Sequence, residues 1–316
     1  MKKYLAITGG VGGAKLALGL TKILSKSEVA FLVNTGDDFE HMGLSISPDL
    51  DTLMYTLSGL SNVELGWGRG GETWRCLDAY KKLGGDSWFS LGDEDLAVHL
   101  RRTELLKSGS SLSEVTADLF RHLGVDYSCW PMSDKPVRTQ IETEAGRLEF
   151  QHYFVRDRCE HVVKSIHFVS SSVAYPTNNL LRYLEDPDLC GIIVCPSNPF
   201  LSVDPILSVH GLKEALIASK VPIVAVSPLI NGQAVKGPTA KIMKELRLVL
   251  SPVSVAAHYQ DFINGFILDE SDAEHAAEIA KSGMSVVTVQ TLMASLDDRI
   301  NLAQTAVNMC DELRGH

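Results

Sequence analysis

The first stretch of the chain that could do chemistry is a glycine-rich turn at residues 9–13. It follows an apolar run at residues 4–7 and precedes a helix-like run at residues 14–24. A strand, a turn and a helix in this order present backbone N–H groups at a helix N-terminus, where the helix dipole favours an anion. One or two glycines would suffice for a tight turn that binds nothing. Four glycines therefore favour a phosphate-binding loop, with contacts from Gly10, Gly12, Gly13 and Lys15.

This loop matches neither of two common nucleotide motifs. A P-loop counted from Gly9 has Ala14 in place of its second glycine and Leu16 in place of its magnesium-binding hydroxyl. A dinucleotide fingerprint counted from Gly10 ends on Lys15 instead of glycine. Phosphate binding thus remains the stronger interpretation, and any metal must be held by other residues.

Two acidic clusters are candidates for that metal site. Asp37 and Asp38 follow the second strand, and Asp49 and Asp51 come just after Pro48, which is typical of a helix start. Taken alone, each cluster fits a structural role as well as metal binding: Asp49 or Asp51 could cap a helix, and Asp37 and Asp38 could lie in a solvated turn. A diphosphate beside carboxylates needs a divalent cation between them, and Mg²⁺ prefers oxygen ligands. Both clusters together predict a Mg²⁺ site made by Asp37, Asp49 and Asp51.

Composition restricts the class of protein. The 316 residues include 29 basic and 39 acidic side chains, for a net charge of −10, and no Lys/Arg-rich block, so nucleic acid is not an expected partner. A hydrophobic content of 45% supports one large core with room for an inserted subdomain. No apolar run long enough for a membrane span and no signal-like start are present, so we expect a cytoplasmic protein. Six cysteines lack C-x-x-C or zinc spacing and are expected to be reduced.

The elements that must position these residues alternate between strand and helix. The short, apolar strand at residues 28–34 is typical of a parallel strand covered on both faces. Further strands are predicted at residues 164–169, 191–195, 221–226, 266–268 and 285–289, with helices at residues 14–26, 178–184 and 296–313. The pattern predicts a Rossmann-like, mostly parallel sheet with helices on both faces and ligands at the carboxyl ends of its strands.

A helical insertion is expected between two parts of this α/β core. We assign residues 1–51 and 125–316 to the core and residues 52–124 to the insertion, which would cover the strand ends as a lid. Its helices are predicted at residues 52–60, 72–83, 93–107 and 112–123, the last with a capping box starting at Ser111. Trp67 could stack on an aromatic substrate or seal two helices. His99, one turn after Asp95, could be an oriented acid/base group or a structural histidine.

Later loops also follow strands and are expected at the edge of the sheet where ligands bind. The turn residues Ser133 and Asp134 precede a hairpin predicted from residues 138–143 and 148–154. Ser197 and Asn198 follow one of the apolar strands. Residues 236–241 place two lysines beside a helix N-terminus, which suits a phosphate, although solvated lysines are the alternative. The donor-binding residues expected from these loops are Ser197, Asn198, Lys236, Gly237, Thr239 and Lys241.

These motifs together resemble the 2-phospho-lactate transferase family of deazaflavin-coenzyme (coenzyme F-420) biosynthesis. They occur in the family's order over nearly the whole chain, which is more specific than any single glycine loop. The matching stretches are Gly9-Gly10-Val11-Gly12-Gly13-Ala14-Lys15, Asn34-Thr35-Gly36-Asp37-Asp38, Ser47-Pro48-Asp49-Leu50-Asp51-Thr52, Leu91-Gly92-Asp93, Pro131-Met132-Ser133-Asp134, Phe150-Gln151, Pro196-Ser197-Asn198-Pro199, Ala225-Val226-Ser227-Pro228 and Thr291-Leu292-Met293.

The resemblance implies a magnesium-dependent phosphotransferase that works as a homodimer. The terminal ribityl hydroxyl of the deazaflavin Fo would attack a guanosine diphospho-acid, take up the phospho-acid and release GMP. The acid differs among family members and is lactate, enolpyruvate or glycerate. Asp37 or Asp51 would orient or deprotonate the hydroxyl, and the sequence leaves open which of them does so. The residues expected around the deazaflavin are Asp49, Thr52, Trp67, Asp93, His99, Ser133 and Asp134.

Two other classes of protein share parts of the pattern. A nucleotide-sugar-binding regulatory protein of the same superfamily would carry Asp-Asp-Gly-Gly-Ser-Ser-Gly after the second strand, where residues 37–41 read Asp-Asp-Phe-Glu-His. A Rossmann-type NAD-dependent enzyme is disfavoured because Lys15 replaces the third glycine. The transferase is therefore the preferred hypothesis.

Overall fold

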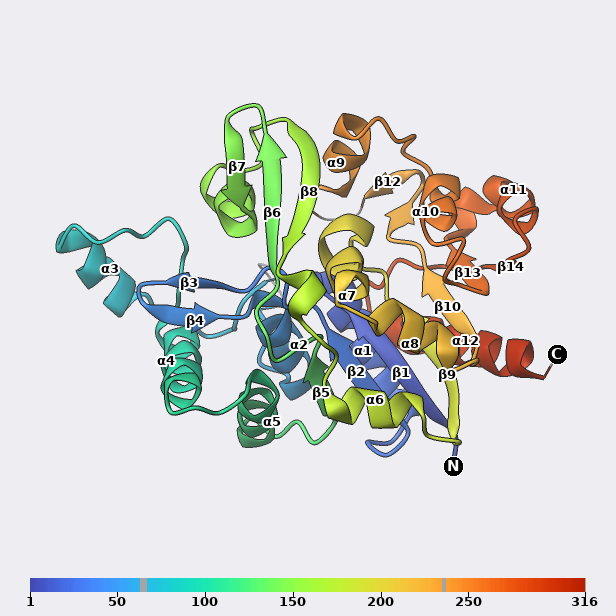
Figure 1. Cartoon of the computed structure of the whole chain (residues 1–316), viewed down its shortest axis with the longest axis horizontal. Coiled ribbons are helices and arrows are strands. Elements are labelled where there is room, and N and C mark those ends of the chain that lie inside the picture. The colour runs from blue at the N-terminus through green and yellow to red at the C-terminus, as the bar shows by residue number, and fades with distance from the viewer. Residues whose placement is uncertain (63–66, 235–236, 316) are drawn as a thin grey trace.

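The computed structural model describes residues 1–62, 67–234 and 237–315. Its centre is a seven-stranded sheet in which every neighbouring pair of strands is parallel, as predicted (Figure 1). The order across the sheet is β14-β13-β10-β9-β1-β2-β5. The strands span β1 (Lys3–Thr8), β2 (Val29–Val33), β5 (Ser128–Pro131), β9 (Leu189–Val194), β10 (Ile223–Val226), β13 (Gly265–Leu268) and β14 (Ser285–Thr288).

The strand order creates a crevice between β1 and β9. From β1 the chain builds outward through β2 to β5, and it then returns to build the other half outward from β9 to β14. Loops that leave β1 and β9 therefore diverge to opposite faces of the sheet. In open α/β sheets, ligands bind at this point, beyond the carboxyl ends of the strands. Both the glycine loop and the loop of residues 196–199 leave the sheet here.

The pleat of β1 divides the core into two layers. Tyr4 and Ala6 face one layer, and Leu5 and Ile7 face the other. The first layer is covered by α1 (Gly10–Ile23), α2 (Pro48–Ser58), α4 (Asp93–Lys107), α5 (Leu112–His122) and α12 (Leu296–Arg314). The second is covered by α6 (Asn178–Leu184), α7 (Asp204–Ser208), α8 (Leu212–Ala218), α9 (Thr239–Glu245), α10 (Pro252–His258) and α11 (Ala276–Ala280). No helix within the described ranges is both long and apolar enough to cross a membrane.

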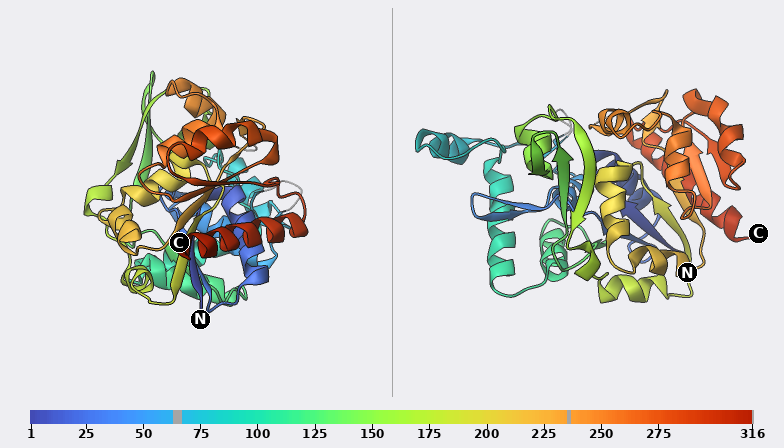
Figure 2. Two further views of the ribbon diagram at one scale, coloured as in Figure 1. Left: turned by 90° about the vertical axis from the view of Figure 1, so that its right-hand side faces the viewer. Right: turned by 45° about the horizontal axis from the view of Figure 1, so that its top comes forward.

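The first and last long helices pack against each other on the same face of the sheet (Figure 2). A Cβ on Gly19 of α1 would lie 2.1 Å from the carbonyl oxygen of Arg299 in α12, so only glycine permits this approach. A further contact joins β1 to α12, where the Tyr4 hydroxyl donates to Asp311 over 2.6 Å. Helix α1, which carries the glycine loop, is thus held by the C-terminal helix.

The segment predicted as a helical insertion is joined closely to the core. Its helices are α2, α3 (Arg75–Lys82), α4 and α5, and the predicted boundary at residue 51 falls inside α2, which begins at Pro48. The capping box at Ser111 is confirmed. Val115 and Phe120 of α5 belong to the same buried cluster as the sheet residue Phe31. Helix α3 and the small hairpin of β3 (Phe39–His41) and β4 (Leu44–Ile46) extend away from the sheet (Figure 1).

A second sheet, antiparallel and three-stranded, lies beside the first. Its order is β7-β6-β8, and the strands are β6 (Arg138–Thr143), β7 (Gly146–Glu149) and β8 (Val163–Val169). The predicted hairpin is confirmed, but the prediction of a strand through residue 154 is wrong. The chain instead turns into a short π-helix at His152–Arg156. Phe150 and Tyr153 are buried and Phe150 stacks on Phe154, a spacing of three and four that fits a helical turn.

Candidate active site

A cavity of about 680 Å³ lies at the carboxyl edge of the parallel sheet. Four of its walls come from loops that follow strands of this sheet: residues 9–12 after β1, 196–202 after β9, 227–230 after β10 and 291–293 after β14. The rest of the lining comes from the first half of α4 and from residues 37, 46–55, 67–68, 89–90, 150–155 and 237–239. The volume is within the usual range for small-molecule sites. The crevice expected from the strand order is therefore present.

The glycine loop closes one wall of this cavity. Gly10 has a φ of 64°, and a Cβ on Gly12 would lie 2.4 Å from the Pro196 carbonyl oxygen, so glycine is required at both positions. The Gly9 N–H donates to Ser197 Oγ over 3.1 Å. Gly13 packs below the loop, where a Cβ would meet Ser197 Oγ at 2.6 Å, and it does not contribute to the lining.

Asp37 and Asp49 meet at the N-terminus of α1. The Asn34 side-chain amide, at the end of β2, donates to Asp37 Oδ1 over 3.2 Å and to Asp49 Oδ2 over 2.9 Å. The other oxygen of Asp49 accepts from the Gly10 N–H over 2.7 Å. One amide group therefore holds carboxylates from two separate loops beside the glycine turn, and both residues line the cavity. Oxygen ligands from two side chains are the usual protein contribution to a Mg²⁺ site.

The electrostatics of this corner also fit a cation. Burial raises the pKa of Asp37 well above its ordinary value, with repulsion from Asp49 and Asp38 adding to it. Burial raises the pKa of Asp49 to about 6, against the opposing hydrogen bonds from Asn34 and Gly10. A bound divalent cation would reverse this penalty by favouring the ionised carboxylates.

Asp38 lies just behind the cavity and permits a test by pH. Burial raises its pKa to about 7, while Arg138 and the Ser47 hydroxyl oppose the shift. The pKa of Asp38 is higher in the folded than in the unfolded protein, so the protonated side chain favours folding. This contribution to the free energy of unfolding is complete below about pH 4 and is lost as pH rises through about 7. We expect Asp38→Asn to stabilise the metal-free protein increasingly over this range, relative to wild type. Thermal unfolding at pH 4 to 8 would measure it, and parallel curves would contradict the expectation.

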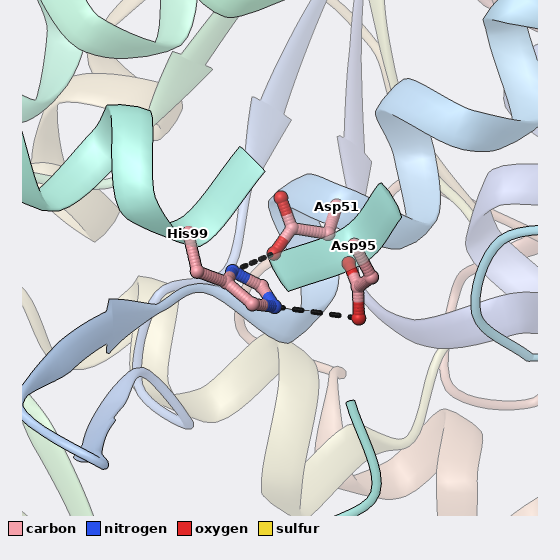
Figure 3. Close-up of side chains that lie close together, drawn as sticks. All are labelled: Asp51, Asp95 and His99. Atoms are coloured by element: carbon pink, nitrogen blue, oxygen red, sulfur yellow. Dashed lines mark ion pairs between the residues drawn. The ribbon is translucent and has the colours of Figure 1, made fainter. Parts of the chain in front are cut away.

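A second buried network involves Asp51, His99 and Asp95 (Figure 3). His99 Nδ1 lies 3.7 Å from Asp51 Oδ2, and its Nε2 lies 3.3 Å from Asp95 Oδ2. The Tyr55 hydroxyl donates to the other oxygen of Asp95. Although burial acts to raise it, the hydrogen bond and charge of His99 and the Tyr55 hydroxyl hold the pKa of Asp95 below its ordinary value. All four side chains line the cavity, two from α2 and two from α4.

Arg102 distinguishes Asp51 from the other predicted metal ligands. Its guanidinium binds both carboxylate oxygens of Asp51, with NH1 3.1 Å from Oδ2. Arg102 NH1 is also 3.0 Å from His99 Nδ1. Ligand atoms of Asp51, Asp95 and His99 lie within 4.8 Å of one another, which is close enough to share an ion. The arginine already supplies a positive charge there, so Asp37 and Asp49 are better suited than Asp51 to a divalent cation.

Most of the residues predicted from sequence meet in this cavity. Asn198 is one of them. Its side-chain oxygen accepts from the Phe200 N–H, and its amide group donates to Thr239 Oγ1 over 2.9 Å. Trp67 is half exposed at the rim. The predicted residues that line the cavity are Gly10, Gly12, Lys15, Asp37, Asp49, Asp51, Thr52, Trp67, His99, Ser197, Asn198, Gly237 and Thr239.

Other predicted residues have structural partners outside the lining. Lys241 Nζ contacts Glu245 Oε1 at 2.6 Å. Asp134 accepts from the Ser113 N–H over 2.7 Å, and Ser133 Oγ accepts from the Lys135 N–H over 3.1 Å. Asp93 caps helix α3 through the N–H of Cys76. Lys236 lies outside the described residues.

The cavity also contains side chains to which the sequence assigned no binding or catalytic role of their own. Tyr55 and Asp95 belong to the buried network, and Phe89, Phe150 and Phe154 provide aromatic surface. Tyr55 is one helical turn beyond Asp51, a spacing that could have identified it. Phe89 and Phe154 follow no comparable pattern, because their positions depend on loops from separate parts of the chain.

Comparison with known proteins agrees with this geometry. Residues 5–306 match the family model described as 2-phospho-L-lactate transferase CofD. The chain belongs to the CofD family. A phosphoenolpyruvate transferase of Kitasatospora aureofaciens is 35% identical, with 99% of each chain covered. A 2-phospho-L-lactate transferase of Methanosarcina acetivorans is also 35% identical, over 97% of this chain and 99% of its own. The CofD-family chain is accordingly a transferase of this type.

A solved structure shares the fold at much lower identity. A protein of the UPF0052 family from Bacillus halodurans superposes with a TM-score of 0.62 at 14% identity, over 97% of this chain and 99% of its own. A second structure from the same organism gives a TM-score of 0.59 at 16% identity. At this identity the likeness concerns the fold alone.

Proposed function

We propose that this CofD-family chain transfers a phospho-acid from a guanosine diphospho-acid to the terminal ribityl hydroxyl of the deazaflavin Fo. The reaction depends on Mg²⁺, releases GMP and belongs to coenzyme F-420 biosynthesis. The acid is lactate, enolpyruvate or glycerate. The main support is the junction of the glycine loop with Asp37 and Asp49 in one cavity of about 680 Å³.

The donor's diphosphate suits the glycine-loop wall. Backbone N–H groups at the start of α1 favour its phosphate oxygens, but the Asp49 carboxylate is bound to the first of these groups. An anionic donor at this place therefore requires positive charge beside Asp49. Asp37 and Asp49 would hold Mg²⁺, which when bound neutralises charge on the diphosphate.

The acceptor's ring suits the aromatic part of the lining. Trp67 and Phe89 contribute from one segment of the chain, and Phe150 and Phe154 contribute from another. Phe150 and Phe154 are stacked with their ring planes 11° apart. Aromatic faces of this kind bind flat conjugated rings by stacking. The ring would thereby be held while its ribityl chain extends toward the acidic corner.

The transfer step then makes one bond and breaks another. The ribityl oxygen forms a bond to the phosphorus that carries the acid, and the bond from that phosphorus to the GMP oxygen breaks. The hydroxyl proton passes to a cavity carboxylate. Asp37 fits this role better than Asp51, because Arg102 already binds both oxygens of Asp51. Positioning and charge stabilisation account for most catalysis of phosphoryl transfer.

Direct assay tests the proposal. Purified protein is incubated with Fo, Mg²⁺ and each of the three donors, while GMP and the mass of the deazaflavin product are followed. We expect equal amounts of GMP and phosphodiester product with at least one donor, and loss of both with excess EDTA. Absence of turnover with every donor, together with tight binding of a nucleotide sugar, would favour the regulatory class instead.

We extend the proposal to a cytoplasmic homodimer that binds no nucleic acid. The dimer rests on the family resemblance, and the net charge of −10 supports the absence of nucleic-acid binding. Sedimentation velocity should give twice the mass of one 34.5 kDa chain. A single-chain mass at micromolar concentration would contradict the dimer.

A further inference from the structure

Residues 67–92, here called the arm, carry two parts of the cavity wall. Near its second end, Leu91 is buried with Trp88 and Phe89 against the β3–β4 hairpin. Trp67 and Gly68 line the cavity at one end of the arm, and Phe89 and Ser90 line it at the other. Between these ends the arm runs out to α3, which projects away from the sheet (Figures 1 and 2). Helix α3 buries only Leu77 among its eight residues. The outer part of the arm therefore depends on contacts at its base to stay in place.

Two carboxylates make those contacts by capping each other's helices. Glu72, on the arm, accepts from the N–H groups of Glu94 and Asp95 in α4 over 2.9 and 2.8 Å. Asp93, on α4, accepts from the N–H groups of Arg75 and Cys76 in α3 over 3.2 and 3.0 Å, and also from the Thr73 hydroxyl. Each carboxylate thus satisfies the free N–H groups at the start of the other helix.

The surrounding residues leave room for this arrangement and strengthen it. A Cβ on Gly92 would lie 2.1 Å from Cδ of Glu72, so glycine at residue 92 permits the cap. Arg69 of the arm forms an ion pair with Glu94 of α4. The Asp93 N–H also donates to the Thr73 carbonyl over 2.9 Å. Four independent contacts therefore fix the arm to the first turn of α4.

That first turn is functionally important because it also carries Asp95. The Asp95 N–H is bound by Glu72, while its carboxylate accepts from Tyr55 and lies beside His99. Movement of the arm would consequently disturb both the aromatic wall and the buried network. Asp93, which looks from the sequence like a substrate contact, acts in the structure through the arm instead.

We propose that the arm is a cover over the acceptor end of the cavity, latched to α4 by Glu72 and Asp93, and that the latch excludes water from the donor. This inference rests on the proposed function. With the arm latched, the acceptor hydroxyl is the nucleophile and GMP leaves as the phosphodiester forms. With the arm released, water can take the hydroxyl's place: its oxygen bonds to the same phosphorus, the same bond to GMP breaks, and the free phospho-acid and a proton are the other products.

The test compares transfer with hydrolysis in three variants. Glu72→Ala removes the cap, Glu72→Gln retains one accepting oxygen, and Gly92→Ala displaces the cap sterically while keeping its charge. Glu114→Ala is the matched control, because Glu114 is also a capping glutamate but belongs to α5 and lies outside the cavity lining. The measured quantity is GMP released per phosphodiester formed, at saturating Fo.

We expect a ratio near one for wild type and Glu114→Ala, and several GMP released per product for Glu72→Ala and Gly92→Ala. Glu72→Gln should be intermediate. Trypsin should also cut α3 about five- to tenfold faster in Glu72→Ala and Gly92→Ala, as expected from loss of a helix cap. Its exposed cleavage sites there are Arg75, Lys81 and Lys82. A merely structural role for Glu72 would lower the rate without changing the ratio.

An unchanged ratio and unchanged cleavage in folded Glu72→Ala and Gly92→Ala would overturn the inference. If one variant fails to fold, the other decides. Proteolysis needs no substrate, so it judges the latch even if the wild-type chain transfers nothing to Fo, which would overturn the proposed function instead. If the wild type transfers to Fo and the variants change cleavage but not the ratio, the exclusion of water by the latch is overturned while the proposed function stands.

Discussion

Replacing Asp37 with asparagine is expected to abolish most activity while making the metal-free protein more stable. The pKa of Asp37 is raised in the folded state by burial and by two neighbouring carboxylates, so its ionised form opposes folding at neutral pH. The amide removes that charge together with the oxygen available to Mg²⁺. We expect transfer to fall about 10²–10³-fold and the melting temperature to rise by roughly 2–4 °C. Steady-state assay and calorimetry without added metal would measure both.

The same variant should lose its response to magnesium. Mg²⁺ stabilises any protein that binds it only when folded, so it should raise the melting temperature of wild type and not of Asp37→Asn. Asp38→Asn is the control, since Asp38 neighbours Asp37 but does not line the cavity. Its transfer rate should fall by about tenfold at most, the smallest effect typical of residues that support metal ligands. Full activity of Asp37→Asn would remove Asp37 from both the metal site and the proton transfer.

Replacing Asp51 with asparagine is expected to have the opposite effect on stability. Asp51 and Arg102 are both buried, and the carboxylate binds the guanidinium through both oxygens. The substitution would leave Arg102 as a buried cation with its main partner lost, which typically costs about 3–5 kcal/mol. Urea unfolding followed by circular dichroism would give the change in the free energy of unfolding.

An exposed ion pair provides the comparison for Asp51. Asp126 pairs with Lys26 at 3.2 Å, with both side chains 64% exposed, so Asp126→Asn should change stability little. The double variant Asp51→Asn, Arg102→Gln should recover part of the loss, because no unpaired charge remains. A loss below about 1 kcal/mol in the single variant would show that Asp51 is not needed to balance Arg102.

The fold was predictable because its signals are local. Short apolar strands, the helix periodicity between them and the Ser111 capping box each depend on residues near in sequence, and the observed elements match them. The strand predicted beyond Glu149 was wrong because the residue types permit a strand, whereas burial of Phe150 and Tyr153 on one side requires a turn of helix. Tertiary packing decides such cases.

The site was predictable only where strand ends carry its residues. Asp37 and Ser197 follow strands whose carboxyl ends must meet, so their approach follows from the parallel sheet. The attachment of Arg102 to Asp51 joins residues 51 positions apart on two helices, and no periodicity specifies that pair. Likewise, Asp93 is a residue type that often binds substrates, and its role in capping α3 becomes apparent only from the position of the arm.

The pairing of α1 with α12 determines when the site can be completed during synthesis. The helix that presents the glycine loop rests on residues 296–314, which are synthesised long after α1. Until then the face of α1 around Gly19 has no cover, and Tyr4 lacks its partner Asp311. A nascent chain that stops short of α12 therefore cannot hold the anion-binding loop in place. Activity should consequently appear only once α12 has been made, because β1, α1 and α12 close this part of the fold together.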